Sequence, residues 1–136
     1  MELPFKELTH KEIGCAMEVH RVPGPGFQEY IYHRALAIEM RNTGLKFEEE
    51  FELPVFYKGD QIGLRRVDFW IENTISLEIK AKSDLDNSHL AQGINYIEAS
   101  NIPAGLLINF GAPSLQFKRL HNKFLFSPNT DKPGAL

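Results

Sequence analysis

The sequence predicts an α+β fold in which helices cover both faces of a mixed β-sheet. Hydrophobic and polar residues alternate with a period of two over residues 46–57, 61–71 and 75–82, which is typical of strands with one buried face. Helical spacing precedes these segments and returns at residues 88–100. A near-continuous hydrophobic run at residues 104–110 indicates a strand buried on both faces. Helices on either side of such strands predict a sandwich.

The composition is that of one globular domain. The chain has 136 residues, 43% of them hydrophobic, which is enough for a substantial core. We expect the domain to span residues 1–121 and residues 122–136 to form a poorly ordered C-terminal tail. The single cysteine excludes an intramolecular disulfide, and no Cys/His cluster indicates zinc. We expect no signal peptide, membrane span or membrane partner, and a cytoplasmic location.

Two helices are expected before the strands. The first covers residues 9–21, where Thr9 and Glu12 have the spacing of a capping box. A Pro-Gly-Pro-Gly segment ends it. The second runs from about residue 27 to 42 and is closed by Gly44. Its predicted core stripe consists of Ile31, Ala35 and Ile38.

The central strands form a predicted meander. Pro54 places the first strand at a sheet edge or a bulge. A three-residue turn, Glu72 to Thr74, joins the second strand to the third, and its central asparagine tolerates the left-handed backbone of such turns. In this register the hydrophobic residues are matched, with Phe69 opposite Leu77 and Ile71 opposite Ile75.

A crossover helix and two further strands complete the predicted sheet. The polar loop at residues 84–87 can cap a helix at residues 88–100. Its two stripes are Leu90, Ile94 and Ile97 toward the core, and His89, Gln92 and Tyr96 on a polar side. After the buried strand at 104–110, residues 115–120 are the last strand expected.

The hairpin register also places Asp68 opposite Glu78 and Arg66 opposite Lys80. Directly opposed side chains lie roughly 4.5–5.5 Å apart at Cβ, and like charges there are destabilising. A divalent cation between the two carboxylates would remove the conflict, because Mg²⁺ takes oxygen ligands. The alternative is a solvated strand face with ordinary charges.

Asp68, a hairpin and Glu78-x-Lys80 resemble the core signature of the PD-(D/E)xK nuclease superfamily. Gly26 to Tyr32 reads G-x-x-E-x-x-Y and resembles the GxxExxY family, a branch of that superfamily. The resemblance covers roughly residues 8–120. It implies a restriction-endonuclease-like α/β/α sandwich with a central mixed β-sheet. The implied function is that of a metal-dependent nuclease, a hydrolase of phosphodiester bonds in DNA or RNA.

The resemblance implies a role for each of several residues. Asp68 and Glu78 would bind Mg²⁺ or Mn²⁺ with the backbone carbonyl of Ile79, and Glu29 would add a metal ligand or position the water. The water-activating cation would be Lys80, which also stabilises negative charge at phosphorus. Gln92 would support the site from the crossover helix. Further candidates are Tyr32 and Tyr96 beside the site. Apart from the resemblance, Arg65, Arg66 and Lys82 are candidate phosphate contacts, and the alternative is that they are ordinary exposed charges.

Each candidate also has a structural interpretation. Glu29 at a helix start favours the helix dipole without any chemistry. Buried tyrosines usually pack and hydrogen-bond, and a lone histidine such as His20, His33 or His89 is more often structural. The net charge of −3 gives no overall signal for nucleic acid. The alternative function is therefore a nuclease-fold module that binds nucleic acid or protein without catalysis. A homodimer or a protein partner is left open.

Overall fold

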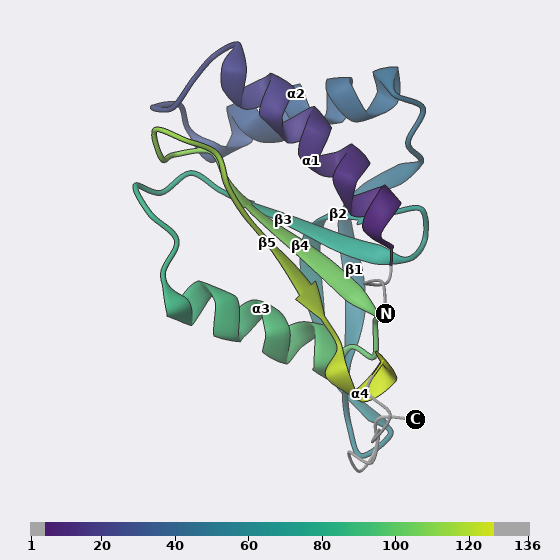
Figure 1. Cartoon of the computed structure of the whole chain (residues 1–136). Helices are drawn as coiled ribbons and strands as arrows, with labels where there is room; N and C mark the ends of the chain where they lie inside the picture. Colours follow the sequence, from purple (N-terminus) through teal and green to yellow (C-terminus); the bar gives the residue numbers. More distant parts are fainter. Residues whose placement is uncertain (1–4, 127–136) are drawn as a thin grey trace.

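The computed structural model describes residues 5–126 and contains one five-stranded sheet between helices. The elements are α1 (Lys6–Arg21), α2 (Glu29–Asn42), β1 (Phe47–Tyr57), β2 (Asp60–Ile71), β3 (Ile75–Lys80), α3 (Asn87–Ala99), β4 (Ala104–Asn109), β5 (Gln116–His121) and α4 (Lys123–Phe126). The strand order is β1-β2-β3-β4-β5, with β3 and β4 parallel and the other neighbours antiparallel. Helices α1 and α2 cover one face and α3 the other (Figure 1). The predicted α+β sandwich with a central mixed sheet is confirmed.

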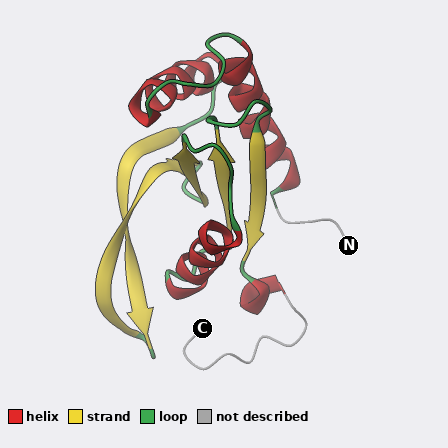
Figure 2. Cartoon of the chain, turned by 90° about the vertical axis from the view of Figure 1, so that its left-hand side faces the viewer, coloured by secondary structure: helices red, strands yellow, loops and turns green. Residues whose placement is uncertain are grey.

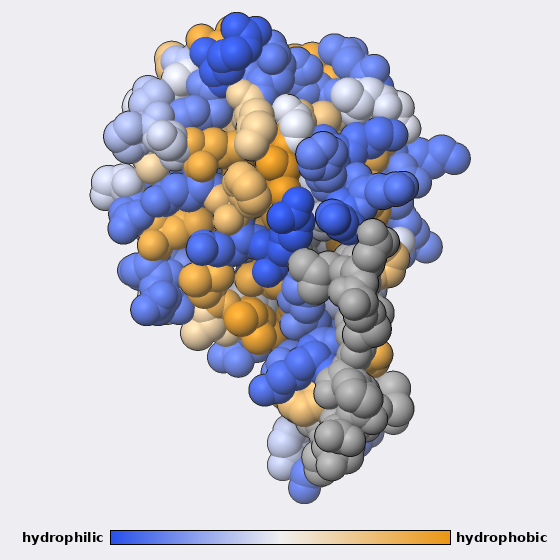
Figure 3. Space-filling view, in the orientation of Figure 1, coloured by the Kyte–Doolittle hydropathy of each residue, from blue (hydrophilic) through white to orange (hydrophobic). Residues whose placement is uncertain are grey.

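The hydrophobic core has one part on each face of the sheet. The larger part packs α1 and α2 against the central strands, and the smaller part joins Trp70 and Leu107 to Ile97 of α3. All six residues of β4 are buried, as the hydrophobic run at residues 104–110 predicted. On the face shown in Figure 3, hydrophilic side chains surround several hydrophobic areas. No helix in the described part of the chain is long and hydrophobic enough to cross a membrane.

The hairpin of β1 and β2 is longer than the strands beside it. Residues Phe69 to Ile71 of β2 pair with β3, whereas the ladder with β1 continues to Asp60. Figure 2 shows the two strands curving away from the rest of the sheet. β1 is an edge strand that contains Pro54, and its ladder shifts register after Val55. The predicted edge position is therefore confirmed.

The predicted capping box at Thr9 is wrong. Helix α1 begins at Lys6, one turn earlier, after Phe5 in the left-handed region with φ 59°. The Thr9 hydroxyl lies 3.1 Å from the carbonyl oxygens of both Phe5 and Lys6, which is a mid-helix contact to the preceding turn. Glu12 is fully buried instead of capping the first turn. The sequence contains the capping pattern, but the helix begins three residues before Thr9, so Thr9 lies inside the helix.

The predicted core stripe of α2 is only partly correct, because Ala35 packs against the core but is itself only partly buried. The structure buries the neighbouring stripe and leaves Ile38 55% exposed. Hydrophobic residues lie on several sides of this helix, so their spacing alone could not select the face that packs on the sheet. The buried residues are Tyr32, Leu36, Ala37 and Met40.

Helix α3 is capped at its predicted polar loop. The Asp86 carboxylate accepts hydrogen bonds from the backbone N–H groups of Ser88 and His89. In turn, Nδ1 of His89 accepts a hydrogen bond from the backbone N–H of Asp86. Ile97 is buried as predicted, Leu90 is partly buried, and Ile94 is 36% exposed. The helix therefore contacts the sheet mainly through its C-terminal half.

Part of the expected C-terminal tail has a defined structure. The buried side-chain amide of Asn122 donates hydrogen bonds to the carbonyls of Ile97 and Ile102, at 3.4 and 3.1 Å. Residues Lys123–Phe126 form the short helix α4. The remainder of the expected tail, residues 127–136, lies outside the described residues.

Candidate functional site

The β2–β3 hairpin has the predicted register near its turn. Phe69 pairs with Leu77, and Ile71 pairs with Ile75. The ladder ends at Phe69, so the predicted direct apposition of Asp68 and Glu78 is wrong. One carboxylate oxygen of Asp68, Oδ2, instead accepts a hydrogen bond from the backbone N–H of Ile79 at 2.8 Å.

An irregularity in β1 and β2 turns Asp68 toward α2. Glu50 has a left-handed backbone with φ 53°, and the β1–β2 ladder omits the pair of Glu50 and Asp68. On the two sides of this point, Phe69 packs in the core under α2, whereas Val67 packs in the core under α3. Asp68 therefore lies beside residues of α2. Glu78 belongs to the regular strand β3 and lines a pocket beneath α3.

The predicted apposition of Arg66 and Lys80 is absent as well. Arg66 pairs in the β1–β2 ladder with Glu52, and its Nη1 lies 3.8 Å from Oε2 of Glu50. Lys80 pairs with Asn109 of β4. The β2–β3 ladder contains no pair between Phe69 and the start of β2, so neither charged pair of the sequence-based register forms.

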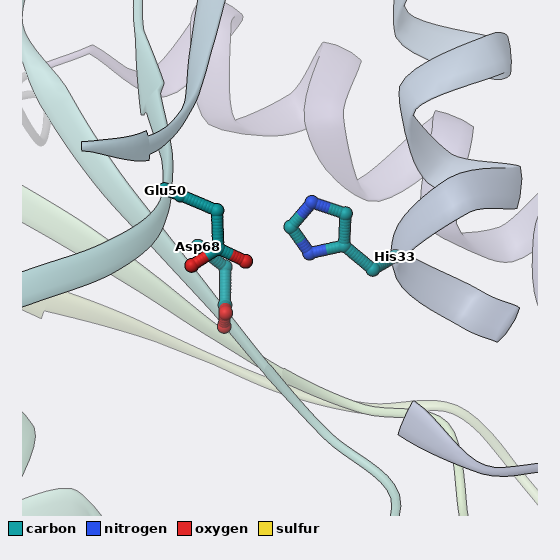
Figure 4. A group of neighbouring side chains, drawn as sticks. All are labelled: His33, Glu50 and Asp68. Atoms are coloured by element: carbon teal, nitrogen blue, oxygen red, sulfur yellow. The ribbon is translucent and has the colours of Figure 1, made fainter. Parts of the chain in front are cut away.

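The pocket on the α2 side of the sheet contains two of the predicted site residues, Glu29 and Asp68. Ligand atoms of His33, Glu50 and Asp68 all lie within 4.8 Å of one another, and Figure 4 shows the imidazole turned toward the two carboxylates. Burial raises the pKa of Asp68 and Glu50 raises it further, while the hydrogen bond from Ile79 opposes the change. Burial and the charge of Asp68 likewise raise the pKa of Glu29.

The pocket on the α3 side contains the other three predicted side chains, Glu78, Lys80 and Gln92. The Arg65 guanidinium contacts the Glu78 carboxylate and lies over the ring of Tyr96, with 3.9 Å from Cζ to the centroid. The side chains of Arg65 and Glu78 are only 17% and 21% exposed. The negative charge of Glu78 is therefore already compensated by a neighbouring cation.

Lys80 is electrostatically linked to both pockets. Its side chain lines the α3-side pocket, yet its positive charge lowers the pKa of Asp68 and of Glu29 against the effect of burial. Lys82 has the same effect on Glu29. The structure therefore divides the predicted acids between two pockets and places the charge of Lys80 within reach of both.

Tyr32 has the role of a packing residue. Its hydroxyl donates to the carbonyl of Gly24 at 2.6 Å and accepts from the Phe27 backbone at 3.2 Å. Its ring stacks on Phe110 with 4.8 Å between centroids. These contacts tie the Pro-Gly loop to the start of α2, and they favour the structural interpretation of this tyrosine.

Sequence reasoning missed Glu50 and gave His33 no special weight. The signal for His33 was its position four residues after Glu29, which puts both on one face of a helix. Glu50 gave no comparable signal, because it is one of three consecutive glutamates in a strand. Only its left-handed backbone, which is uncommon for a glutamate, reveals that it joins Asp68.

These features define a mixed-sheet α/β/α domain with acidic side chains on both sides of its β2–β3 hairpin. A family model described as the PD-(D/E)XK nuclease superfamily matches residues 6–120. The chain belongs to this superfamily, and its five-stranded sheet with flanking helices is consistent with the restriction-endonuclease-like fold. No curated protein and no solved structure matches the chain. The match does not resolve the GxxExxY branch, so membership of that branch stays a proposal.

Proposed function

We propose that this protein is a metal-dependent nuclease that hydrolyses phosphodiester bonds in DNA or RNA. The observation that carries the proposal is the superfamily match over residues 6–120, which covers β1 to β4, all but the last residue of β5, and the residues of both pockets. Asp68, Glu78 and Lys80 supply the residue types of the signature. The two acids line different pockets, and the positive charge of Lys80 lowers the pKa of Asp68 against the effect of burial.

The donor groups fit a divalent cation on the α2 side. The Ile79 N–H holds Oδ2 of Asp68, which orients the carboxylate and leaves Oδ1 for a ligand. Glu29 lines the same pocket from the first turn of α2. Glu78 and the Ile79 carbonyl stay proposed ligands. Glu78 lines the α3-side pocket and contacts Arg65, so it would have to leave both that pocket and Arg65 to reach this cation. Such a cation would supply a bound water of lowered pKa and neutralise charge at phosphorus.

The remaining residues would orient the water and the phosphate. We assign to Lys80 the stabilisation of negative charge that develops on the phosphoryl oxygens. Gln92 lines the pocket of Glu78 and Lys80, and its amide would hold the substrate or the water by hydrogen bonds. Arg34 borders the α2-side pocket, and Lys82 is exposed beyond the end of β3, so both are proposed phosphate contacts.

A cleavage panel tests this function. Single- and double-stranded DNA and RNA are incubated with the protein and Mg²⁺ or Mn²⁺, with Asp68→Ala as the inactive control. We expect cleavage of at least one nucleic acid by the wild type and none by Asp68→Ala. Binding of nucleic acid without cleavage of any substrate would favour the non-catalytic binding module instead.

A further inference from the structure

We propose that His33, Glu50 and Asp68 bind one first-row transition-metal cation on the α2 side of the sheet, and that the imidazole makes this position select Mn²⁺ over Mg²⁺. The inference deepens the proposed nuclease function and rests on it for the role of the cation. It differs from the sequence-based ligand set, because it adds His33 and Glu50 and leaves Glu78 out.

The three ligands converge from three different elements. His33 comes from α2, Glu50 from β1 and Asp68 from β2, and one ligand atom of each lies within 4.8 Å of the others (Figure 4). Ligand atoms about 2.1 Å from one cation lie about 3.0–4.2 Å from each other in octahedral geometry. Small side-chain adjustments would therefore close the cluster around an ion.

The imidazole of His33 is held as metal-binding histidines usually are. Its Nε2 lies 3.0 Å from Oε1 of Glu49, and the other oxygen of Glu49 lies 3.5 Å from Nη2 of Arg41. A histidine ligand almost always gives its second ring N–H to a carboxylate, which fixes the tautomer and the ring orientation. With Nε2 engaged by Glu49, Nδ1 is the nitrogen left to bind a cation. Stacking on Phe69, with 4.3 Å between centroids, also restrains the ring.

The charges of the neighbouring acids favour this position over one at Glu78. The Arg65 guanidinium compensates Glu78 in a largely buried pair. Glu50 has a weaker partner, because Arg66 lies 3.8 Å away and the two side chains are 63% and 52% exposed. Exposed ion pairs contribute little stability, so Glu50 can exchange Arg66 for a cation at low cost.

The mixed donor set determines which cation binds best. Mg²⁺ prefers oxygen ligands and dehydrates reluctantly, whereas imidazole nitrogen suits first-row transition metals. One nitrogen and two carboxylates therefore favour Mn²⁺ over Mg²⁺. The carboxylates of Glu50 and Asp68 balance the two positive charges of the ion.

The test measures cation binding to the whole chain without nucleic acid. Titration calorimetry gives the affinities for Mn²⁺ and Mg²⁺, and electron spin echo spectroscopy of bound Mn²⁺ detects a directly coordinated ¹⁴N nucleus. The variants are His33→Gln and Glu50→Gln. Their matched controls are His10→Gln and Glu48→Gln, which change an exposed histidine and an exposed glutamate outside the cluster.

We expect Mn²⁺ to bind the wild type more tightly than Mg²⁺ and to show the ¹⁴N coupling. His33→Gln should abolish the coupling and weaken Mn²⁺ at least about tenfold, with a smaller effect on Mg²⁺. Glu50→Gln should weaken both ions, and the two controls should match the wild type. Glu49→Gln keeps the ring and should weaken Mn²⁺ as well, which provides a test if a His33 variant does not fold.

Two outcomes separate this inference from the nuclease proposal. Mn²⁺ that binds without ¹⁴N coupling, or equally well to His33→Gln and Glu50→Gln, overturns the inference and leaves the nuclease proposal intact. Mn²⁺ that binds through His33 in a protein without any cleavage activity supports the cation site and contradicts the nuclease proposal. Absence of Mn²⁺ binding to the wild type contradicts the inference directly.

Discussion

Lys80 is the residue at which catalysis and binding make different predictions. If the protein is a nuclease, Lys80→Ala should abolish hydrolysis while Mn²⁺ still binds, because the carboxylates remain. Lys80→Arg should have little activity, since the planar, always charged guanidinium group of arginine is a poor substitute for the compact ammonium group of lysine. The cleavage rate and the Mn²⁺ affinity are measured on the wild type, Lys80→Ala and Lys80→Arg.

A binding module gives the opposite pattern. Lys80→Ala would then only weaken nucleic-acid affinity and reduce its salt dependence by one phosphate contact. Lys118→Ala, which changes an exposed lysine of β5, is the control. Unchanged cleavage by Lys80→Ala would remove this lysine from the mechanism.

Glu12 predicts an unusual pH dependence of stability. The residue is fully buried in α1, neither carboxyl oxygen has a hydrogen-bond partner among the described residues, and burial raises its pKa to about 8. The folded protein therefore keeps this proton up to about pH 8, whereas the unfolded chain releases it at the ordinary glutamate pKa, roughly 4.3. Between these values the unfolded state binds fewer protons, so the free energy of unfolding falls as pH rises, by at most about 1.4 kcal/mol per pH unit.

The variant Glu12→Gln isolates this effect. It should reduce the loss of stability between pH 5 and 8 and be more stable than the wild type at pH 8. Denaturant unfolding at several pH values measures the difference, to which other acids contribute equally in both proteins. Identical pH slopes for wild type and variant would contradict the assignment.

At the scale of elements, Asn109 joins the end of β4 to the segment that follows β3. Its fully buried amide accepts from the Lys82 N–H at 2.8 Å, and it donates to the Lys82 carbonyl at 2.9 Å and to Oε1 of Gln116 at 3.0 Å. Asn109→Ala would remove these partly buried hydrogen bonds, which contribute about 0.5–1.5 kcal/mol each. We expect a lowered free energy of unfolding, measured with denaturant.

The control for this variant is Asn95→Ala, because Asn95 is exposed on α3. It should change the unfolding free energy little. Asn109→Ala with the stability of Asn95→Ala would show that the segment after Lys80 is held by other contacts, for example by the close approach of Gly111 to the Lys82 backbone.

The sequence predicted the strands more accurately than the faces of the helices. Alternation and the hydrophobic run at residues 104–110 are local patterns, and they determined the strands and the register at Phe69. The buried face of α2 depends on contacts with distant residues, which the spacing of Ile31 and Ile38 does not contain. The meander and the resemblance together were enough to predict the fold.

The candidate site was predicted in composition but not in arrangement. The resemblance selected Asp68 and Glu29, which do share a pocket. Strict alternation would keep Asp68 and Glu78 on one face of the sheet, and the left-handed residue Glu50 breaks that alternation. Residues 48–50 are all glutamates, so the sequence does not indicate which of them adopts this conformation.

For the whole molecule, cation binding should raise the melting temperature. A ligand that binds only the folded state at a concentration one hundred times its Kd adds about 2.7 kcal/mol of stability. Asp68→Ala should abolish the gain given by Mn²⁺, while Asp60→Ala at the far end of the hairpin should keep it. A wild-type melting temperature that does not respond to millimolar Mn²⁺ would count against the cation site.

The same measurement on Glu78→Gln distinguishes the two ligand sets. A cation held by His33, Glu50 and Asp68 keeps its stabilising effect in this variant. A cation that needs Glu78, as the sequence-based register predicted, loses most of it.

The long β1–β2 hairpin implies a gradient of amide protection along a single strand. The part of β2 that precedes Phe69 has no ladder with β3 and pairs only with β1. Such a two-stranded ribbon is only marginally stable in water. Hydrogen–deuterium exchange should therefore be slowest in β4 and become faster along β2 toward Ile62, because local opening there needs little free energy. Glu50 and Asp68 lie where the ribbon leaves the sheet, whereas His33 belongs to the helical layer. A cation that joins these residues would brace the base of the ribbon and slow its exchange at positions that the ion never touches.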